Sequence, residues 1–409
     1  MITVEKALET VLAHTKTLPA EEVLLADALG RVLAEEVRAD RDLPPFDRSA
    51  MDGYAVRAGD TTQAPVVLEV TGQVRAGQFP DRALEPGKAV QIMTGAPVPA
   101  GATAVQPVEK TRAVDGGARV EILSPVEPGA HIARRGTEVR EGDLVLEAGR
   151  TLDPASLAVL ASVGKGRLRV GRRPTVSVIV TGDELVEVWE KPTGGRIRNS
   201  NGPALVAQAR WAGAEVRDLG VVPDDATRIA DAVRAAFASD MVLLSGGVSE
   251  GAYDLVEPVL ERFDVGLLFT KVAIKPGAPL VFGRRGDTLV FGLPGNPVSS
   301  QVTFDLFVRA ALLRLQGASV VRRPRIEIEL AEAVKNRSGR EAYLPACVRS
   351  ENGRLLARPV PSQGSGDLVA HARANALVIL PAERTAAEAG ERTGAILLGN
   401  FLERDGAPL

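Results

Sequence analysis

The sequence predicts a multidomain protein with a central α/β part flanked by β domains. From about residue 174 to 316, apolar runs that fit buried strands alternate with helical patterns. Such alternation indicates βαβ units, a mostly parallel sheet and helices on both of its faces. At about 47–136 and again after Pro324, short alternating runs are separated by Pro-Gly, Asp-Gly or Asn-Gly turns, which is typical of β domains.

Within the first half of the chain, residues 3–17 have the apolar spacing of an amphipathic helix. An extended, proline-marked stretch follows at Asp42–Asp47. A second helix is predicted at 154–162, with Asp153 as its N-cap and Pro154 at its first position. The strands predicted between these helices are Val66–Val74, Ala89–Met93, Thr103–Val108 and Arg119–Leu123.

The α/β part is predicted in more detail. Its strands are Val176–Val180, Val216–Val221, Met241–Leu244 and Thr288–Gly292, and its helices are Pro203–Ala212, Ala226–Phe237, Pro258–Phe263 and Val298–Leu315. The strands predicted after it are Ile326–Leu330, Tyr343–Arg349, Leu355–Val360, Ala376–Leu380 and Ala395–Leu398.

Composition excludes several classes of protein. The 409 residues are enough for two to four domains. Because 49 Lys and Arg balance 52 Asp and Glu, we expect no nucleic-acid partner. No run of 18 apolar residues and no signal peptide is evident, so we expect no membrane association. The single cysteine, Cys347, fits a reducing cytosol and a cytoplasmic location. With only three histidines, a bound metal would need oxygen ligands.

Three loops follow predicted strands of the α/β part, namely Thr181–Leu185, Ser245–Gly251 and Leu293–Pro297. Ligands of open parallel sheets bind at the carboxyl ends of the strands, so these loops are expected to share one crevice. Glycine-rich backbone with serine hydroxyls suits phosphate or another anion. The alternative is that the glycines only relieve strain in ordinary turns.

Acidic side chains accompany these loops, and Mg²⁺ bridged between carboxylates and substrate phosphates is the natural metal for them. For Asp224 and Asp254 the alternative is a helix N-cap. Lys271 and Lys275 precede a Pro-Gly turn and could hold an oxyanion; the alternative is a solvated edge strand.

Several blocks resemble one known family. Pro44-Pro-Phe-Asp-Arg-Ser-Ala-Met-Asp-Gly-Tyr-Ala55 is similar to the signature of the MoeA family, the molybdopterin molybdenumtransferases, which include the gephyrin E domain. Further blocks match in the same order, so that the resemblance spans the full chain: Ile92–Pro97, Thr181–Glu184, Ser245–Ser249, Lys271–Gly277 and Gly292–Pro297.

The resemblance implies a fold of four domains. They are a discontinuous N-terminal helical and extended domain for dimerisation (1–46 and 137–173), a β insertion domain (47–136), a central three-layer molybdopterin-binding α/β domain (174–322) and a C-terminal β barrel (323–409). It also implies a homodimer that inserts molybdate into adenylylated molybdopterin, releasing AMP and forming molybdenum cofactor with Mg²⁺ as the divalent cation. The molybdopterin adenylyltransferase and molybdoenzymes are further implied partners.

The resemblance also assigns roles to residues of this sequence. Catalytic roles fall on Asp52, Thr94, Glu184, Asp224, Asp254, Lys271 and Lys275, of which Glu184, Asp224 and Asp254 are also the metal ligands. Substrate-binding roles fall on Gly182, Asp183, Ser245, Gly246, Gly247, Ser249, Pro294, Asn296, Ser299, Arg340 and Ser365, and Ser299, Arg340 and Ser365 match positions associated with molybdate.

Two positions depart from the family pattern. Ala278 stands where the family commonly has a second lysine, and Glu138 stands where an aspartate is common. Both departures bear on the molybdate geometry.

Two other functions compete with molybdate insertion. A molybdopterin adenylyltransferase resembles the α/β part alone, so the β domains argue against it. A gephyrin-like scaffold that binds partner peptides would need a peptide groove, and only 4% of the residues are aromatic.

Overall fold

The structure is a computed structural model that describes residues 1–247 and 255–399. It divides into two compact units. The first comprises Met1–Glu35, Ala148–Asp153 and the described part of Arg167–Leu409, and the second comprises Glu36–Glu147 and Pro154–Gly166. The division into four domains remains a prediction. Among the described residues, no helix is both long enough and apolar enough to cross a membrane.

A six-stranded sheet forms the centre of the first unit. Its order is β16 (Glu215–Val222), β13 (Thr175–Thr181), β17 (Met241–Ser245), β21 (Thr288–Leu293), β20 (Pro279–Arg285) and β18 (Gly266–Lys271). The first four strands are parallel, as predicted. The sequence analysis did not predict β20 and β18, which extend the sheet in antiparallel fashion, so that β18 is its edge.

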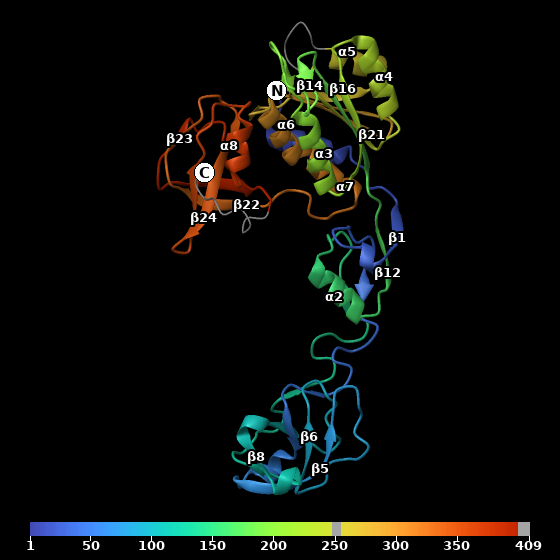
Figure 1. Ribbon diagram of the computed structural model, residues 1–409, viewed down its shortest axis with the longest axis vertical. Coiled ribbons are helices and arrows are strands. Elements are labelled where there is room, and N and C mark those ends of the chain that lie inside the picture. The colour runs from blue at the N-terminus through green and yellow to red at the C-terminus, as the bar shows by residue number, and fades with distance from the viewer. Residues whose placement is uncertain (248–254, 400–409) are drawn as a thin grey trace. The chain divides into compact units, whose positions relative to one another are not determined.

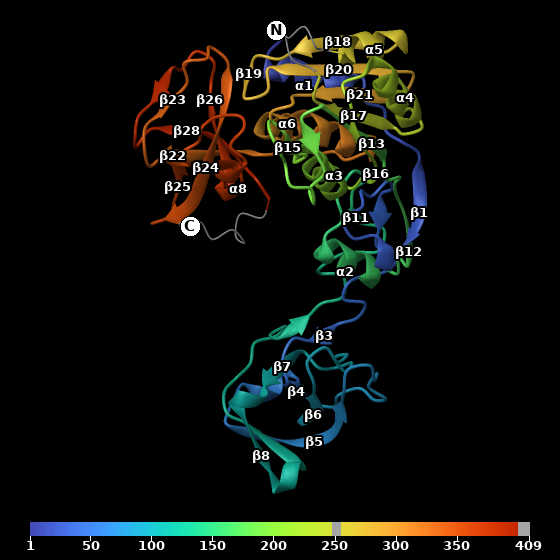
Figure 2. The ribbon, with the colours of Figure 1, turned by 45° about the horizontal axis from the view of Figure 1, so that its top comes forward.

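Helices cover both faces of this sheet, as Figures 1 and 2 show. On β13, Val176, Val178 and Val180 pack into one apolar cluster and Ile179 packs into another, because successive side chains point to opposite faces. The first face is covered by α1 (Val4–Ala13), α3 (Asn201–Trp211), α6 (Pro297–Thr303) and α7 (Arg309–Leu315), and the second by α4 (Ala226–Ala236) and α5 (Val256–Arg262). A π-helical stretch, Phe304–Val308, joins α6 to α7, so the predicted long helix is confirmed in extent.

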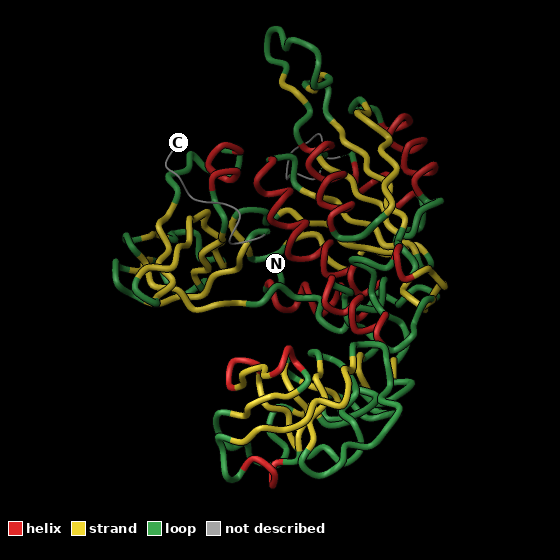
Figure 3. The backbone as a smooth tube through the Cα atoms, turned by 60° about the horizontal axis from the view of Figure 1, so that its bottom comes forward, coloured by secondary structure: helices red, strands yellow, loops and turns green. Residues whose placement is uncertain are grey.

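The C-terminal strands close into a barrel, which confirms that prediction. In order they are β24 (Glu341–Glu351), β25 (Arg354–Pro359), β22 (Arg325–Leu330), β28 (Arg392–Leu397) and β26 (Ala376–Leu380), and β26 pairs with β24 again. The strands are yellow in Figure 3. Their interior is a separate apolar cluster that includes Ile328, Val348 and Val378.

One short strand joins the barrel to the α/β part. β19 (Ile274–Lys275) pairs in parallel with the beginning of β24. The remaining elements of this unit are β1 (Ala20–Leu24), β12 (Arg167–Gly171), β14 (Leu185–Val186), β15 (Ile197–Arg198), β23 (Val334–Lys335), β27 (Ala386–Ala387), α8 (Leu368–Arg373) and the 3-10 turn Leu25–Asp27.

The second unit is a β domain with its own apolar clusters. Its six-stranded sheet has the order β7 (Ala104–Pro107), β4 (Gly53–Val56), β6 (Lys88–Ile92), β5 (Val66–Val74), β9 (Arg119–Ile122) and β8 (Thr111–Val114). Its other elements are β2 (Val37–Arg38), β3 (Arg48–Ser49), β10 (Ile132–Ala133), β11 (Leu144–Leu146), α2 (Pro154–Ser162) and the 3-10 turns Ala58–Thr61, Val108–Lys110 and Asp115–Gly117.

Candidate active site

The three loops expected to share a crevice do meet at the carboxyl ends of β13, β17 and β21. The backbone N–H of Gly246 donates to the carbonyl of Leu293 at 3.3 Å. The Ser245 hydroxyl lies 3.5 Å from the carbonyl of Pro294. These loops are therefore adjacent in their described residues, and their sharing of one ligand-binding crevice stays a prediction.

One buried side chain joins two of these loops, and the sequence analysis missed it. The amide of Asn201, at the beginning of α3, donates to the Ser245 hydroxyl and to the carbonyl of Gly295, both at 2.8 Å. Asn201 is only 9% exposed. An asparagine at a helix start usually indicates a cap, so this role could not be recognised from the residue pattern.

The loop backbones approach each other too closely for side chains larger than glycine. Gly246 has φ +97°, and a Cβ there would lie 2.4 Å from the carbonyl oxygen of Thr181. The side chain of Thr181 is 4% exposed, and its hydroxyl has no hydrogen-bond partner among the described residues. A buried hydroxyl of this kind is costly unless a ligand or water satisfies it.

One of the acidic residues caps a helix, and two others face each other. Asp225, not Asp224, caps α4, because its carboxylate accepts from the backbone N–H groups of Thr227 and Arg228 at 3.0 and 2.9 Å. The alternative of Asp224 as the cap is therefore wrong.

Asp224 faces the first loop instead. Its carboxylate accepts from the N–H of Asp183 at 3.4 Å, and the Asp183 carboxylate accepts from the N–H of Asp224 at 3.1 Å. Glu184 folds back over Gly182, where a Cβ would meet its carboxylate oxygen at 2.7 Å. Ser249 and Asp254 lie outside the described residues.

These acids do not form a complete metal site by themselves. Within residues 1–247 and 255–399, no three His, Cys, Asp or Glu side chains gather closely enough to hold a metal ion. Asp183 and Asp224 are both exposed, and no ion pair with a described Lys or Arg engages them. Two carboxylates beside these glycine-rich loops still suit Mg²⁺, which is commonly held by one or two carboxylates together with substrate phosphates.

A second group forms where β19 meets β24. The backbone N–H of Glu341 donates to the carbonyl of Ala273, which brings the neighbouring Arg340 beside the Lys271–Gly277 block. Lys275 is exposed, and the part of the chain that the structure describes pairs neither Lys275 nor Arg340 with a carboxylate. Lys271 lies at the end of β18, the edge strand, and its carbonyl accepts from the N–H of Ile2.

The beginning of α6 adjoins this second group. Asn296 is the N-cap residue of α6, and Ser299 lies buried in the first turn. A Cβ on Gly277 would lie 3.4 Å from the carbonyl oxygen of Ser299. The carbonyl of Ser365 accepts from the N–H of Val298 at 3.0 Å. Two cations and two serines from separate parts of the chain are therefore brought together.

In the second unit, Asp52 and Thr94 are also in contact. The Asp52 carboxylate accepts from the backbone N–H of Thr94 at 2.6 Å and from its hydroxyl at 2.8 Å. These two hydrogen bonds, the backbone one first, hold the pKa of Asp52 below its usual value. Pairing of Gly53 with Ile92 between β4 and β6 positions both residues at the same end of the sheet.

Comparison with known proteins identifies the family. The chain matches the MoeA N-terminal region (domain I and II) over residues 2–164, a probable molybdopterin binding domain over 177–314 and the MoeA C-terminal region (domain IV) over 327–398. It is 36% identical over 404 residues to the molybdopterin molybdenumtransferase of Bacillus subtilis, covering 97% of this chain and 94% of that protein. The chain belongs to the MoeA family.

Further MoeA relatives agree. Molybdopterin molybdenumtransferase 2 of Mycobacterium tuberculosis is 39% identical over 379 residues, covering 90% of this chain and 92% of that protein. The crystal structure of the molybdopterin biosynthesis MoeA protein from Pyrococcus horikoshii superposes with a TM-score of 0.82 at 33% identity, covering 97% of this chain and all of that one.

Ion pairs hold the signature block of this MoeA chain, Pro44–Ala55, in place. Asp47 accepts from the Arg134 guanidinium at 2.6 Å and from the backbone N–H of Arg135 at 2.9 Å. Glu138, one of the two departures, accepts from the Arg48 guanidinium at 2.9 Å. Glu138 therefore has a structural partner inside the second unit. Ala278, the other departure, is half-buried and its carbonyl accepts from the N–H of Val272.

Proposed function

We propose that this chain is a molybdopterin molybdenumtransferase of molybdenum cofactor biosynthesis. It inserts molybdate into adenylylated molybdopterin, releases AMP and forms molybdenum cofactor. Its relatives of nearly full length carry that name. The observation that carries the proposal is that β19 pairs with the beginning of β24, which brings the backbone of Lys275 close to that of Arg340, and that neither cation has a carboxylate partner among the described residues.

The converging loops bind the phosphates and the pterin of the substrate. Gly182, Gly246 and Gly247 keep the backbone accessible, since each has a positive φ and a Cβ would clash at each of them. The hydroxyl of Ser245 and the buried hydroxyl of Thr181 supply polar contacts. Asp183, Pro294, Asn296 and Ser249 complete the predicted substrate contacts.

Mg²⁺ fits the acidic side chains at this end of the sheet. Asp224 and Glu184 would hold it, with Asp254 as the third ligand that the family resemblance assigns. When bound, the ion would supply Lewis-acid stabilisation of the charge on the departing AMP. Asp183 and Asp224 are kept facing each other by their reciprocal backbone hydrogen bonds, and this arrangement supports the assignment.

Molybdate, the second substrate, binds at Lys275, Arg340, Ser299 and Ser365, with Lys271 close by in sequence. The positive charges of the Lys275 ammonium and the Arg340 guanidinium lower the electrostatic cost of bringing a dianion towards a phosphate-bearing ligand. The protein positions and neutralises its two substrates, and the proposal needs no covalent nucleophile. The single cysteine, Cys347, is hydrogen-bonded to the carbonyl of Arg373 within the barrel region.

The decisive experiment is turnover of defined substrates. Incubation with adenylylated molybdopterin, molybdate and Mg²⁺ is expected to release AMP and form cofactor, and omission of molybdate is expected to abolish cofactor formation. Formation of adenylylated molybdopterin from ATP would instead identify an adenylyltransferase. Retention of partner proteins without any turnover would identify a scaffold. Cell fractionation tests the cytoplasmic location that we also propose.

We further propose a homodimer whose site is shared between subunits, with Asp52 and Thr94 donated by one chain and Lys275 by the other. The support is the family resemblance and the placement of these residues in different compact units. An isologous dimer then has two equivalent composite sites.

Complementation tests the shared site. Asp52→Ala and Lys275→Ala are each expected to be inactive. After subunit exchange, a mixed dimer contains one site with both lesions and one intact site, so activity is expected to return. Verified exchange without recovery would place Asp52 and Lys275 of each site in the same chain.

A further inference from the structure

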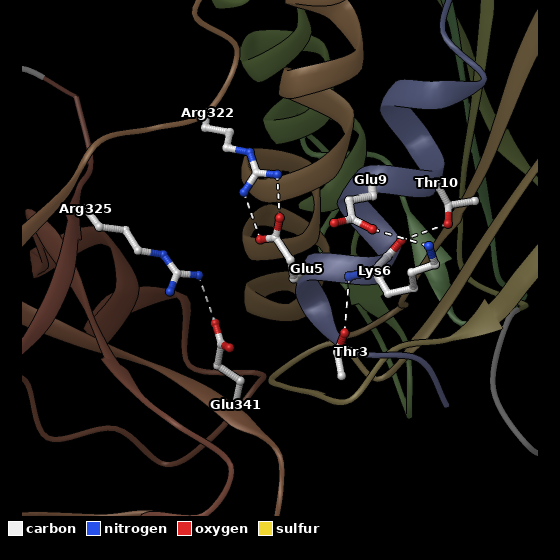
Figure 4. A network of polar contacts seen from close by, with 8 residues as sticks. All are labelled: Thr3, Glu5, Lys6, Glu9, Thr10, Arg322, Arg325 and Glu341. Carbon is white, nitrogen blue, oxygen red and sulfur yellow. Dashed lines mark hydrogen bonds and ion pairs between the residues drawn. The ribbon is translucent and has the colours of Figure 1, made fainter.

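Glu341, which follows the proposed molybdate ligand Arg340, lies in a polar cluster of its own. Its carboxylate accepts from the Tyr343 hydroxyl at 2.6 Å and from the Arg325 guanidinium at 3.2 Å. Figure 4 shows the contact with Arg325. Its backbone N–H donates to the carbonyl of Ala273 at 3.1 Å. Glu341 therefore contacts the barrel strands through its side chain and the α/β part through its backbone.

We propose that Glu341 is a positioning residue for molybdate: it fixes the beginning of β24 so that Arg340 faces Lys275. This inference rests on the proposed function, because it assumes that Arg340 and Lys275 bind the dianion.

Strand alternation supports this geometry. In the parallel pairing of β19 with β24, Lys275 lies opposite Ala342 and Ile274 lies opposite Glu341. Because successive residues of a strand point to opposite faces, Ala342 shares the face of Lys275, while Glu341 and Tyr343 share the other face. Arg340 lies in the bend immediately before β24, so anchoring Glu341 fixes the backbone from which the Arg340 side chain extends beside the exposed lysine.

The anchor itself is rigid. Tyr343 is 1% exposed and packs into the core of the α/β part, although it belongs to a barrel strand. Burial and the neighbouring Glu341 carboxylate raise the pKa of Tyr343 far above its ordinary value, so the phenol remains a hydrogen-bond donor. Glu341 thus receives its hydrogen bond from a side chain that has little freedom to move.

The Arg325 side of the cluster is fastened as well. Arg325 begins β22, and the nearby Arg322 makes two hydrogen bonds with Glu5 of α1, at 2.8 and 2.6 Å, as Figure 4 shows. The turn before Glu341 is held from the inside, because the buried Asn336 amide donates to the Arg340 carbonyl at 2.8 Å. The Arg340 carbonyl and the neighbouring Glu341 side chain are therefore both held by hydrogen bonds.

A purely structural role is the competing explanation. The Arg325 side chain is 56% exposed and that of Glu341 is 25% exposed, and ion pairs of this kind contribute little to stability. A structural role therefore predicts a small effect that is the same for both substrates. A positioning role predicts an effect confined to molybdate.

Glu341→Gln separates these roles in the full-length enzyme. Glutamine keeps the shape and an acceptor for Tyr343 but loses the charge that attracts Arg325. We expect the KM for molybdate to rise about fivefold, while the KM for adenylylated molybdopterin and kcat at saturating molybdate stay unchanged. Glu327→Gln is the matched control, because Glu327 pairs with Arg392 on the same barrel and both side chains are exposed. It is expected to leave every constant unchanged.

A double-mutant cycle with Arg340→Ala completes the test. If Glu341 acts through Arg340, Glu341→Gln adds nothing in the Arg340→Ala background. Additive effects, or a rise in KM for both substrates, overturn the inference. An unchanged molybdate KM in Arg340→Ala also overturns it, whereas molybdate-dependent turnover by the wild type still supports the proposed function. An effect in Arg340→Ala without one in Glu341→Gln refutes the positioning role alone.

Discussion

Asn201→Ala tests whether one side chain holds the substrate loops together. The substitution removes the donor to both the Ser245 hydroxyl and the Gly295 carbonyl, each 2.8 Å away. Leaving a buried acceptor without its donor costs about 1–3 kcal/mol. Because Ser245 still donates to the Pro294 carbonyl 3.5 Å away, its hydroxyl keeps one partner and its share of the loss falls at the lower end of this range. The expected decrease in the free energy of unfolding is therefore about 2–4 kcal/mol.

The stability change can be measured by urea unfolding followed by tryptophan fluorescence. The chain has two tryptophans, so a Trp189→Phe background leaves Trp211, at the end of the same helix α3, as the reporter. The same variants are then titrated with AMP by calorimetry. A loosened pair of loops is expected to raise the Kd for AMP about tenfold, equivalent to about 1.4 kcal/mol.

Arg210→Ala is the control, because Arg210 is an exposed residue of the same helix. The substitution changes helix propensity by a few tenths of a kcal/mol at most, and no hydrogen bond or ion pair joins the Arg210 side chain to the described loop residues. The reasoning is refuted if the free energy of unfolding of Asn201→Ala differs from that of this control by less than about 0.5 kcal/mol and its Kd for AMP equals that of the control. The loops would then not depend on Asn201.

Three further predictions address the charges. Lys275→Ala is expected to raise the KM for molybdate more than the KM for adenylylated molybdopterin. Ala278→Lys is expected to lower the KM for molybdate severalfold, since one more cation near a dianion contributes about 1 kcal/mol. Unchanged steady-state constants in both variants would place the oxyanion elsewhere. Thr94→Val removes one of the two donors that lower the pKa of Asp52, so the acid limb of the pH–kcat/KM profile is expected to move to higher pH while Thr94→Ser leaves it in place; coincident profiles contradict this. For Asp240, burial raises the pKa but is outweighed by the hydrogen bonds from Arg172 and Thr175, which leave it lowered. The stabilisation that Asp240 contributes is therefore present above the unfolded pKa of about 3.9 and is lost as pH falls through the folded pKa. The free energy of urea unfolding of Asp240→Asn is therefore expected to depend less on pH in the acid range than that of the wild type. Equal pH dependence of the two proteins would refute this.

Much of the α/β part was predictable because its strands are continuous apolar runs between helical patterns. Val176–Val180 and Met241–Leu244 fall within β13 and β17. β18 and β20 were not predicted because their apolar runs are short and bounded by glycine and proline. In addition, antiparallel strands added to a parallel sheet leave no crossover helix in the sequence. Periodicity alone does not separate such runs from loops.

The loops that contribute to the site were predictable from the sequence, but the contacts between their residues were not. Asp224 and Asp225 are adjacent, and either could cap α4 from sequence alone; backbone geometry selects Asp225. The meeting of Lys275 with Arg340 depends on pairing between β19 and β24, which joins two domains. Asn201, Asn336 and Glu341 had no sequence signal, because their roles are defined by partners that are distant along the chain or lie in another element.

The two kinds of interaction at this site respond differently to substitution. Neutralisation by charged side chains is graded: under the proposed function each cation contributes about 1 kcal/mol towards a dianion in partly solvated surroundings, so a chain with Ala278 in place of a lysine retains the exposed Lys275 and the half-buried Arg340. Buried hydrogen bonds such as those of Asn201 are not graded, because losing one donor leaves an acceptor unsatisfied. We therefore expect substitution to be tolerated better at such cations than at the buried amides that hold the loops. Under the proposed function, the contribution of Arg340 depends in turn on its orientation, which a long flexible side chain does not fix by itself, so anchoring by Glu341 and Asn336 is expected to matter about as much as one additional charge.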